Sequence, residues 1–148
     1  MRTNFKGSPD EVTALDAYIK LMRAADSITS RAHALLPKGL TLAQFGVLEV
    51  LLHRGPLCQS EIAAKVLKSA GNLTLVVDNL ERDGHVVRER DPSDRRYVTV
   101  KLTPEGDAFI RELFPKVAAS IAREFSVLTL DEQVTLASLC KKAGIGAH

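Results

Sequence analysis

Basic side chains are concentrated in one short part of the chain. Residues 82–101 carry six of them, whereas residues 58–81 are sparsely charged. The six are Arg82, Arg88, Arg90, Arg95, Arg96 and Lys101. Guanidinium and ammonium groups bind phosphate and carboxylate oxygens, so this stretch can contact an anionic partner. Carboxylates interleave with the cations, a pattern that also fits a solvated charged hairpin: Asp83, Glu89, Asp91 and Asp94.

The sequence Asp-Pro-Ser-Asp-Arg-Arg at 91–96 predicts a tight turn that ends in two arginines. Asp94 precedes Arg96 by two positions, close enough in such a turn to accept a hydrogen bond and orient the guanidinium. A solvated ion pair that contributes little is the alternative interpretation.

Other reactive side chains show no catalytic or metal-binding arrangement. The chain has no P-loop, dinucleotide fingerprint or nucleophile motif. Its histidines stand at unrelated spacings: His33, His53, His85 and His148. We therefore expect no enzyme, no cofactor and no metal. Cys58 and Cys140 are too far apart to indicate a disulfide framework. Cys58 precedes a predicted helix, where a thiol can be reactive, so it is a possible redox residue, although a structural role is favoured. Cys140 lies on an apolar stripe and is expected in the core.

Two strands should present the arginine-rich turn. Residues 86–90 and 97–102 flank it, and in the second strand Val98, Val100 and Leu102 alternate with polar residues. Gly84 should end the preceding helix in the left-handed conformation.

Two helices are predicted before this hairpin. A short one spans about 59–67 with Cys58 as its N-cap, and a second runs from a Ser69 cap to about Arg82. Four apolar residues of the second helix recur at helical spacing and should pack inward: Leu73, Val76, Val77 and Leu80. Its opposite face is mostly small or polar: Gly71, Asn72, Thr74, Leu75, Asp78 and Arg82.

The remainder of the chain is predicted to be helical. Helices are expected over 9–36, from Leu42 after a Thr41 capping box, from Pro104 with a kink at Pro115, and after a capping box at Thr129. The fold class is mostly α with a small β-hairpin wing. We expect an N-terminal helix at 1–36, a winged helix-turn-helix at 40–103 and C-terminal helices at 104–148.

A short helix, a tight turn, a second helix and a basic hairpin together suit the grooves of duplex DNA. The second helix can enter the major groove, where Asn72 and Thr74 can reach base edges and Leu75 can meet a thymine methyl. Gly71 permits close approach, and Lys68 and Ser69 are placed for phosphates. An arginine at the hairpin tip can enter the neighbouring minor groove.

Bulk properties add little to this prediction. The net charge is only +2, and 45% of the residues are hydrophobic. No stretch approaches the ~20 apolar residues of a membrane span, and the N-terminus lacks a signal-peptide core. A cytoplasmic protein without a membrane partner is therefore expected.

Four segments resemble the MarR (multiple antibiotic resistance regulator) family of bacterial regulators: Gln59-Ser60-Glu61-Ile62-Ala63, Leu80-Glu81-Arg82-Asp83-Gly84, 91–97 and Val100-Lys101-Leu102-Thr103-Pro104-Glu105-Gly106. The resemblance implies a homodimer joined by its N- and C-terminal helices, a pseudo-palindromic operator, and wing contacts by Arg96 and Arg95. It also implies a repressor that releases DNA when a small aromatic or phenolic ligand binds or a cysteine is oxidised.

Two positions depart from the family pattern. His85 replaces a common leucine. A hydrogen-bonded surface histidine is favoured there, and the alternative is a first wing strand that packs differently or is pH-sensitive. Cys58 replaces the usual hydroxyl cap. Two alternatives stay open: a redox-responsive regulator that uses Cys58, and a winged helix that contacts a protein instead of DNA. Loss of duplex affinity on removal of Arg96 distinguishes the DNA-binding alternative.

Overall fold

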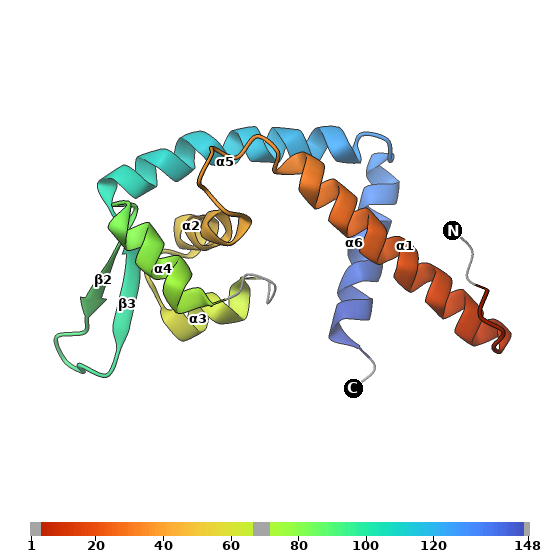
Figure 1. Cartoon of the computed structure of the whole chain (residues 1–148), viewed down its shortest axis with the longest axis horizontal. Coiled ribbons are helices and arrows are strands. Elements are labelled where there is room, and N and C mark those ends of the chain that lie inside the picture. The colour runs from red at the N-terminus through yellow and green to blue at the C-terminus, as the bar shows by residue number, and fades with distance from the viewer. Residues whose placement is uncertain (1–3, 67–71, 147–148) are drawn as a thin grey trace. The chain divides into compact units, whose positions relative to one another are not determined.

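The computed structural model describes residues 4–66 and 72–146. In these residues it contains six helices and three short strands (Figure 1). In chain order they are α1 (Pro9–Ala32), α2 (Leu42–Arg54), β1 (Leu57–Cys58), α3 (Gln59–Lys65), α4 (Leu73–Arg82), β2 (Val86–Arg90), β3 (Val98–Leu102), α5 (Pro104–Phe125) and α6 (Leu130–Ile145). The predicted class, mostly α with a β-hairpin wing, is confirmed.

The chain divides into two compact units. One consists of Leu35–Ala118 and the other of Met1–Ala34 with Ala119–His148. The first half of α5 therefore belongs to the same unit as the elements from α2 to β3.

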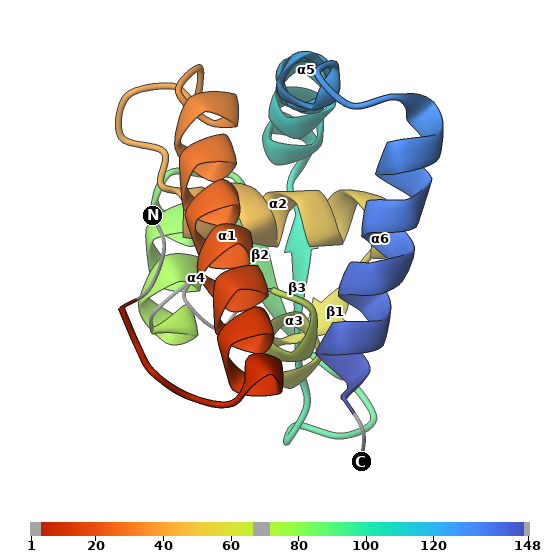
Figure 2. The same ribbon diagram turned by 90° about the vertical axis from the view of Figure 1, so that its right-hand side faces the viewer.

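The core of the Leu35–Ala118 unit forms around α2, which lies between the first half of α5 and the α3–α4 pair (Figures 1 and 2). Every element from α2 to α5 except β1 contributes a buried side chain: Phe45, Val47, Leu48, Leu51, Ile62, Val77, Leu80, Val86, Val100, Ile110, Leu113 and Val117. Complete burial of one such side chain stabilises the fold by about 1.5–3 kcal/mol. The inward stripe predicted for α4 is confirmed, because Val77 and Leu80 are fully buried.

The three strands form one antiparallel sheet in the order β1-β3-β2. The two strands predicted around the turn are present, and in this hairpin Val86 pairs with Leu102 and Arg90 with Val98. β1 was not predicted, since two residues are too few to show a period. Leu57 and Cys58 pair with Val100 and Thr99, so β1 places the start of α3 against β3.

Local capping determines where most helices begin. Thr41 and Gln44 form the predicted capping box of α2, and Thr129 and Glu132 that of α6. Gly84 has a φ of 80°, the left-handed conformation expected after α4.

Four predicted boundaries were wrong. β3 begins at Val98 instead of residue 97. α1 ends at Ala32 instead of residue 36, and α3 ends at Lys65 instead of residue 67. α4 begins at Leu73 with Asn72 as its N-cap, not after Ser69. Both Ser69 and Asn72 are good capping residues, so composition alone did not separate them. Ser69 itself lies outside the described residues.

The unit formed by the two chain ends buries few side chains. In α1 only Ala32 is buried, and α6 buries none. Cys140 is exposed, so the prediction of a core position for it was wrong. The reason is that α6 leaves its apolar residues uncovered, with Val134 70% and Leu139 58% exposed. No helix within residues 4–66 and 72–146 is long and apolar enough to cross a membrane.

Candidate nucleic-acid interface

The outer face of α4 is open and carries small or polar side chains. Asn72, Thr74 and Asp78 are exposed, and Leu75 is 56% exposed although it is apolar. This face matches the one predicted from the sequence. Of the six residues predicted to contact DNA through this helix, Lys68, Ser69 and Gly71 lie outside the described residues.

The first turn of α4 is organised by three hydrogen bonds that involve side chains. Asn72 Oδ1 accepts from the backbone N–H groups of Thr74 at 3.0 Å and Leu75 at 3.4 Å. Thr74 Oγ1 accepts from Nε2 of Gln59, the first residue of α3, at 2.7 Å. No sequence pattern indicated the Gln59 contact, because its partners stand fifteen residues apart. Together these bonds fix both predicted base-contacting polar side chains to the helix pair.

The tip of the hairpin binds and orients Arg96. Its Nε lies 3.0 Å from Asp94 Oδ1, and its Nη2 lies 2.8 Å from Oδ2. The backbone N–H of Arg96 also donates to Oδ1 at 3.1 Å. These side-chain and backbone bonds hold the pKa of the Asp94 carboxyl below its ordinary value, and the side-chain bonds raise the pKa of Arg96. The predicted Asp94–Arg96 contact is therefore present, while the Arg96 side chain stays 86% exposed.

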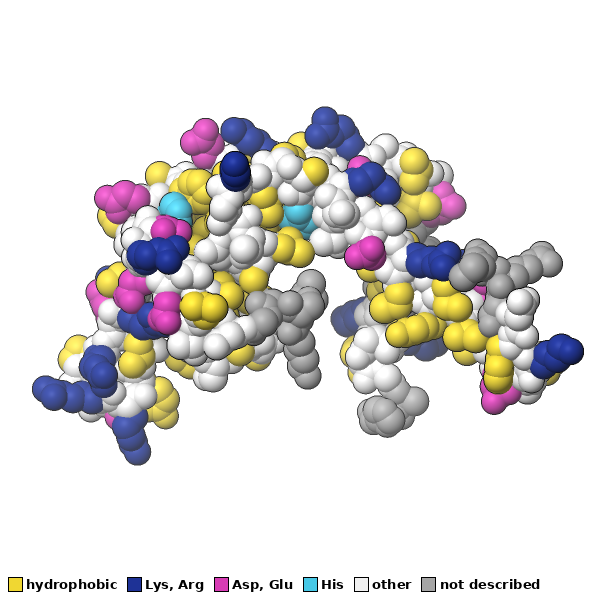
Figure 3. All heavy atoms as spheres, in the orientation of Figure 1, with side chains coloured by type: hydrophobic (Ala, Val, Ile, Leu, Met, Phe, Trp, Pro, Cys, Tyr) yellow, Lys and Arg dark blue, Asp and Glu magenta, His cyan; other side chains and the backbone are white. Residues whose placement is uncertain are grey.

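The rest of the turn is held by its own hydrogen bonds. Asp91 Oδ1 accepts from the hydroxyl and the backbone N–H of Ser93, at 2.6 and 2.8 Å, which lowers the pKa of Asp91. Arg90 Nη1 donates to the carbonyl of Arg95 at 3.2 Å. Arg95 is exposed, and Figure 3 shows Lys and Arg side chains gathered over this end of the hairpin. The turn thus presents cations on an ordered backbone.

Arg88 connects the hairpin to α4. Its Nη2 lies 2.7 Å from Asp78 Oδ1, and its Nη1 lies 3.0 Å from Glu81 Oε1. The backbone N–H of Arg88 donates to Glu81 Oε2 at 3.0 Å, and Nη2 also donates to the carbonyl of Thr74 at 3.4 Å. The Arg88 side chain is only 23% exposed. Sequence reasoning counted Arg88 among the basic residues but did not identify this contact.

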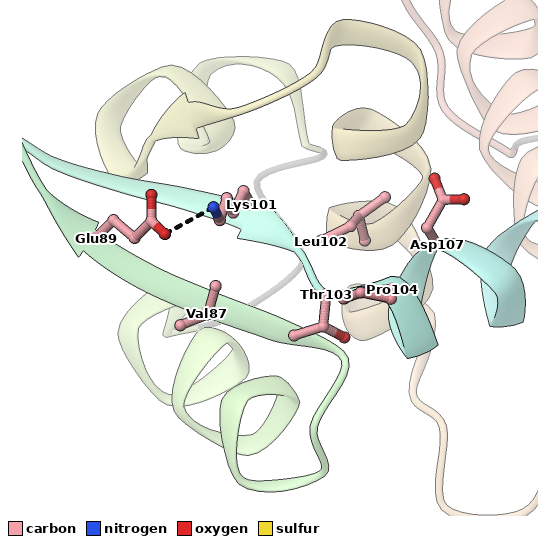
Figure 4. A pocket seen from close by; sticks show the side chains of 7 residues that line it. All are labelled: Val87, Glu89, Lys101, Leu102, Thr103, Pro104 and Asp107. Atoms are coloured by element: carbon pink, nitrogen blue, oxygen red, sulfur yellow. Dashed lines mark ion pairs between the residues drawn. The ribbon is translucent and has the colours of Figure 1, made fainter.

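A groove lies beside the hairpin, where β2 and β3 meet the start of α5 (Figure 4). It has a volume of about 620 Å³ and is lined by Val87, Glu89, Lys101, Leu102, Thr103, Pro104 and Asp107. Lys101 Nζ lies 2.6 Å from Glu89 Oε1 inside it. Lys101, the last cation of the basic stretch, is thus paired with a carboxylate in this groove.

His85 differs from its prediction. Its ring stacks on Phe109 with centroids 4.5 Å apart, and its Nδ1 is buried with no hydrogen-bond partner among the described residues. It is therefore a half-buried packing residue, not a hydrogen-bonded surface histidine. Next to it, a Cβ built on Gly106 would overlap the carbonyl oxygen of His85. Glycine at 106 lets the first turn of α5 approach this backbone closely.

The cysteines lie in different surroundings. Cys58 is half-buried as the N-cap residue of α3, with Sγ 3.1 Å from Ser60 Oγ. Its backbone N–H donates to Glu61 at 3.0 Å. Both Cys58 and Cys140 are free thiols. Within the described residues no cluster of His, Cys, Asp or Glu could hold a metal ion.

Comparison with known proteins shows which family the chain resembles. A MarR family model matches residues 40–98. The HTH-type transcriptional regulator YkoM of Bacillus subtilis is 40% identical over 151 residues, covering 98% of this chain and 94% of that protein. Its own role is uncharacterised.

Solved structures of other proteins are similar to this chain along most of its length. Sco3205 of Streptomyces coelicolor, a MarR family transcriptional regulator determined in complex with DNA, superposes with a TM-score of 0.78 at 25% identity, covering 97% of this chain and 91% of that one. BpsR of Bordetella bronchiseptica, whose DNA binding is regulated by 6-hydroxynicotinic acid, gives a TM-score of 0.76 at 28% identity, covering 84% and 89%.

Proposed function

This chain belongs to the MarR family of DNA-binding transcriptional regulators, and we propose that it acts as a homodimeric, ligand-responsive repressor on a pseudo-palindromic operator in the cytoplasm. The observation that carries the DNA-binding part is the Asp94–Arg96 pair, which orients an 86% exposed guanidinium at the tip of the hairpin. An oriented arginine loses less rotamer entropy on insertion into a groove than a free one.

In this proposal α4 lies in the major groove and the hairpin tip reaches the adjacent minor groove. Asn72, Thr74 and Leu75 face the bases, because they occupy the exposed side of the first turn of α4. Lys68 and Ser69 contact phosphates, and Gly71 allows close approach. Arg96, with Arg95 beside it, enters the minor groove. The proposed DNA-binding domain is 40–103.

The homodimer is proposed from the two chain ends, 1–36 and 104–148. A 24-residue helix that buries only Ala32 and a 16-residue helix that buries nothing gain little stability within one chain. Large apolar side chains are exposed along them: Tyr18, Leu21, Met22, Leu130, Val134, Leu139 and Ile145. Surfaces of this kind are usually covered in the assembled protein. The same helices of a second copy are the proposed cover.

The proposed effector is a small aromatic or phenolic compound. It is supported by BpsR, a similar structure whose DNA binding is regulated by 6-hydroxynicotinic acid, itself a small aromatic acid. Ligand binding would lower the affinity of the dimer for its operator.

Selection of bound duplexes from a random or genomic pool tests the DNA-binding proposal. We expect enriched sites with two inverted half-sites about one helical turn apart, on one face of the duplex. Recovery of no preferred duplex would contradict the proposal and favour a winged helix that contacts a protein. Once a site is known, small aromatic acids and phenols can be screened for release of the protein from it, and failure of the whole series would remove the effector class.

A further inference from the structure

Gln59 and Asn72 together determine which hydrogen-bonding groups the first turn of α4 can offer to DNA. The side chain of Asn72 has one acceptor oxygen and an NH₂ group with two donors. Its oxygen already accepts from Thr74 N and Leu75 N, at 3.0 and 3.4 Å. The groups left to face outward are therefore donors.

The hydroxyl group of Thr74 is constrained by Gln59 on the neighbouring helix α3. Gln59 Nε2 donates to Thr74 Oγ1 at 2.7 Å. An amide NH₂ cannot accept, so the single hydroxyl hydrogen of Thr74 must point away from Gln59. Gln59 thus fixes the direction of this hydrogen bond. Leu75, the third exposed side chain of the turn, is apolar and adds neither donor nor acceptor.

We propose that Asn72 presents only donors to the groove and that Gln59 is a positioning residue that turns the Thr74 hydroxyl hydrogen outward, leaving Thr74 one donor and one lone pair, so that the first turn of α4 favours bases with major-groove acceptors. This inference rests on the proposed entry of α4 into the major groove. Guanine offers two acceptors, N7 and O6, and thymine offers O4 beside a methyl group that suits Leu75. Adenine and cytosine each present an NH₂ donor there, which Asn72 cannot accept and which only the remaining lone pair of Thr74 could meet. The usual two-bond pairing of asparagine with adenine is also excluded, because it needs the amide oxygen.

Asn72→Asp tests the first half of the proposal. Aspartate caps a helix as well as asparagine does, so α4 keeps its start. The change replaces the two outward donors with an acceptor. Duplex selection should then show cytosine in place of guanine or thymine at one position of each half-site. Affinity for the parent site should fall roughly tenfold or more. Asn4→Asp makes the same charge change at an exposed residue outside the Leu35–Ala118 unit and should leave the selected sequence unchanged.

Gln59→Glu tests the role of Gln59. A carboxylate only accepts, so the Thr74 hydroxyl would have to donate to it and would present only lone pairs to the groove. The preference at the Thr74 position should shift away from guanine and thymine toward adenine and cytosine, because the outward donor is lost. Gln59→Met removes the bond without adding charge, and it should broaden the preference at that position without reversing it. If Gln59 merely supported the fold, its substitution would lower duplex affinity without changing the preferred base at any position.

The outcomes separate this inference from the proposed function. If the parent protein selects a defined site but Asn72→Asp and Gln59→Glu both select that same site with less than a twofold loss of affinity, the inference about Asn72 and Gln59 is wrong and DNA binding stands. If the parent selects no site, both fail together. Thermal unfolding followed by circular dichroism confirms that each variant is folded before selection.

Discussion

The guanidinium of Arg88 lies 2.7 Å from the carboxylate of Asp78, so β2 is bonded to the outer face of α4. A second bond to Glu81 and the limited exposure of Arg88 make this a stronger contact than an ordinary surface ion pair. The two elements proposed to enter neighbouring grooves are therefore connected directly, and not only through the core beneath them.

Arg88→Gln should weaken both the fold and the DNA complex. Two carboxylates would lose their common partner, and we expect the free energy of unfolding to fall by about 1–2 kcal/mol. Duplex affinity should fall as well, because the hairpin would no longer be held against α4. Urea denaturation and fluorescence anisotropy measure the two effects. Lys101→Gln breaks the more exposed Glu89 pair and should change stability by less than about 0.5 kcal/mol. Equal losses in both variants would refute a special role for Arg88.

Arg96→Ala should reduce duplex affinity by roughly 1–3 kcal/mol and lower the slope of log K against log salt by about one unit. The side chain is exposed, and among the described residues it bonds only to Asp94 in the same turn, so the stability of the fold should barely change. Anisotropy titrations at several salt concentrations give both quantities. Arg111→Ala is the matched control, since Arg111 is an exposed arginine paired with Asp107 on α5. An unchanged affinity and slope for Arg96→Ala would show that the hairpin does not contact DNA.

The contribution of Arg96 to duplex affinity should not depend on pH near neutrality. Its hydrogen bonds lower the pKa of Asp94 in the folded protein from an ordinary value of 3.8. A carboxyl whose pKa is lower in the folded protein stabilises the fold at pH values above its unfolded pKa. This stabilisation is lost as the pH falls through the folded pKa. Asp94 is therefore ionised at both about pH 5.5 and about pH 8. The ratio of the dissociation constants of Arg96→Ala and the parent should be equal at the two values. A ratio that shrinks severalfold at the lower pH would contradict this.

Gly106→Ala should destabilise the fold, because its Cβ would overlap the carbonyl oxygen of His85. Relief requires movement of backbone, and we expect a loss of about 1–3 kcal/mol. Gly144→Ala is the matched substitution in α6, where nothing lies within 4 Å of the added Cβ. It should raise stability by up to about 1 kcal/mol through helix propensity. Chemical denaturation compares the two, and an unaffected Gly106→Ala protein would show that the contact can relax.

Leu139→Glu should shift the protein toward monomers if α6 forms the proposed dimer interface. The leucine is 58% exposed in the single chain, and a buried carboxylate in its place would be costly. Sedimentation at micromolar concentration measures the change. Leu42→Glu alters another exposed leucine, in the Leu35–Ala118 unit, and should leave the parent's oligomeric state intact. A parent protein that is itself monomeric under these conditions would contradict the dimer.

Sequence patterns predicted the features that depend on near neighbours. The period-two alternation at Val98 and Val100 located β3, and the Asp94–Arg96 bond spans two positions in a turn. Contacts between distant segments were missed. Gln59 with Thr74 and Arg88 with Asp78 depend on how α3, α4 and β2 pack, and no local pattern encodes that arrangement. The start of α4 was misplaced because two competent caps stood three residues apart.

The close approach at Gly106 also bears on how motion passes through the Leu35–Ala118 unit. The first turn of α5 meets the backbone of His85, the residue before β2, with no side chain between them. Thr103 Oγ1 adds a bond to the carbonyl of Gly84 at 2.6 Å. A contact between backbones has no rotamers with which to absorb a displacement. Any shift of the start of α5 is therefore passed on to β2, and the hairpin moves with the helix that follows it.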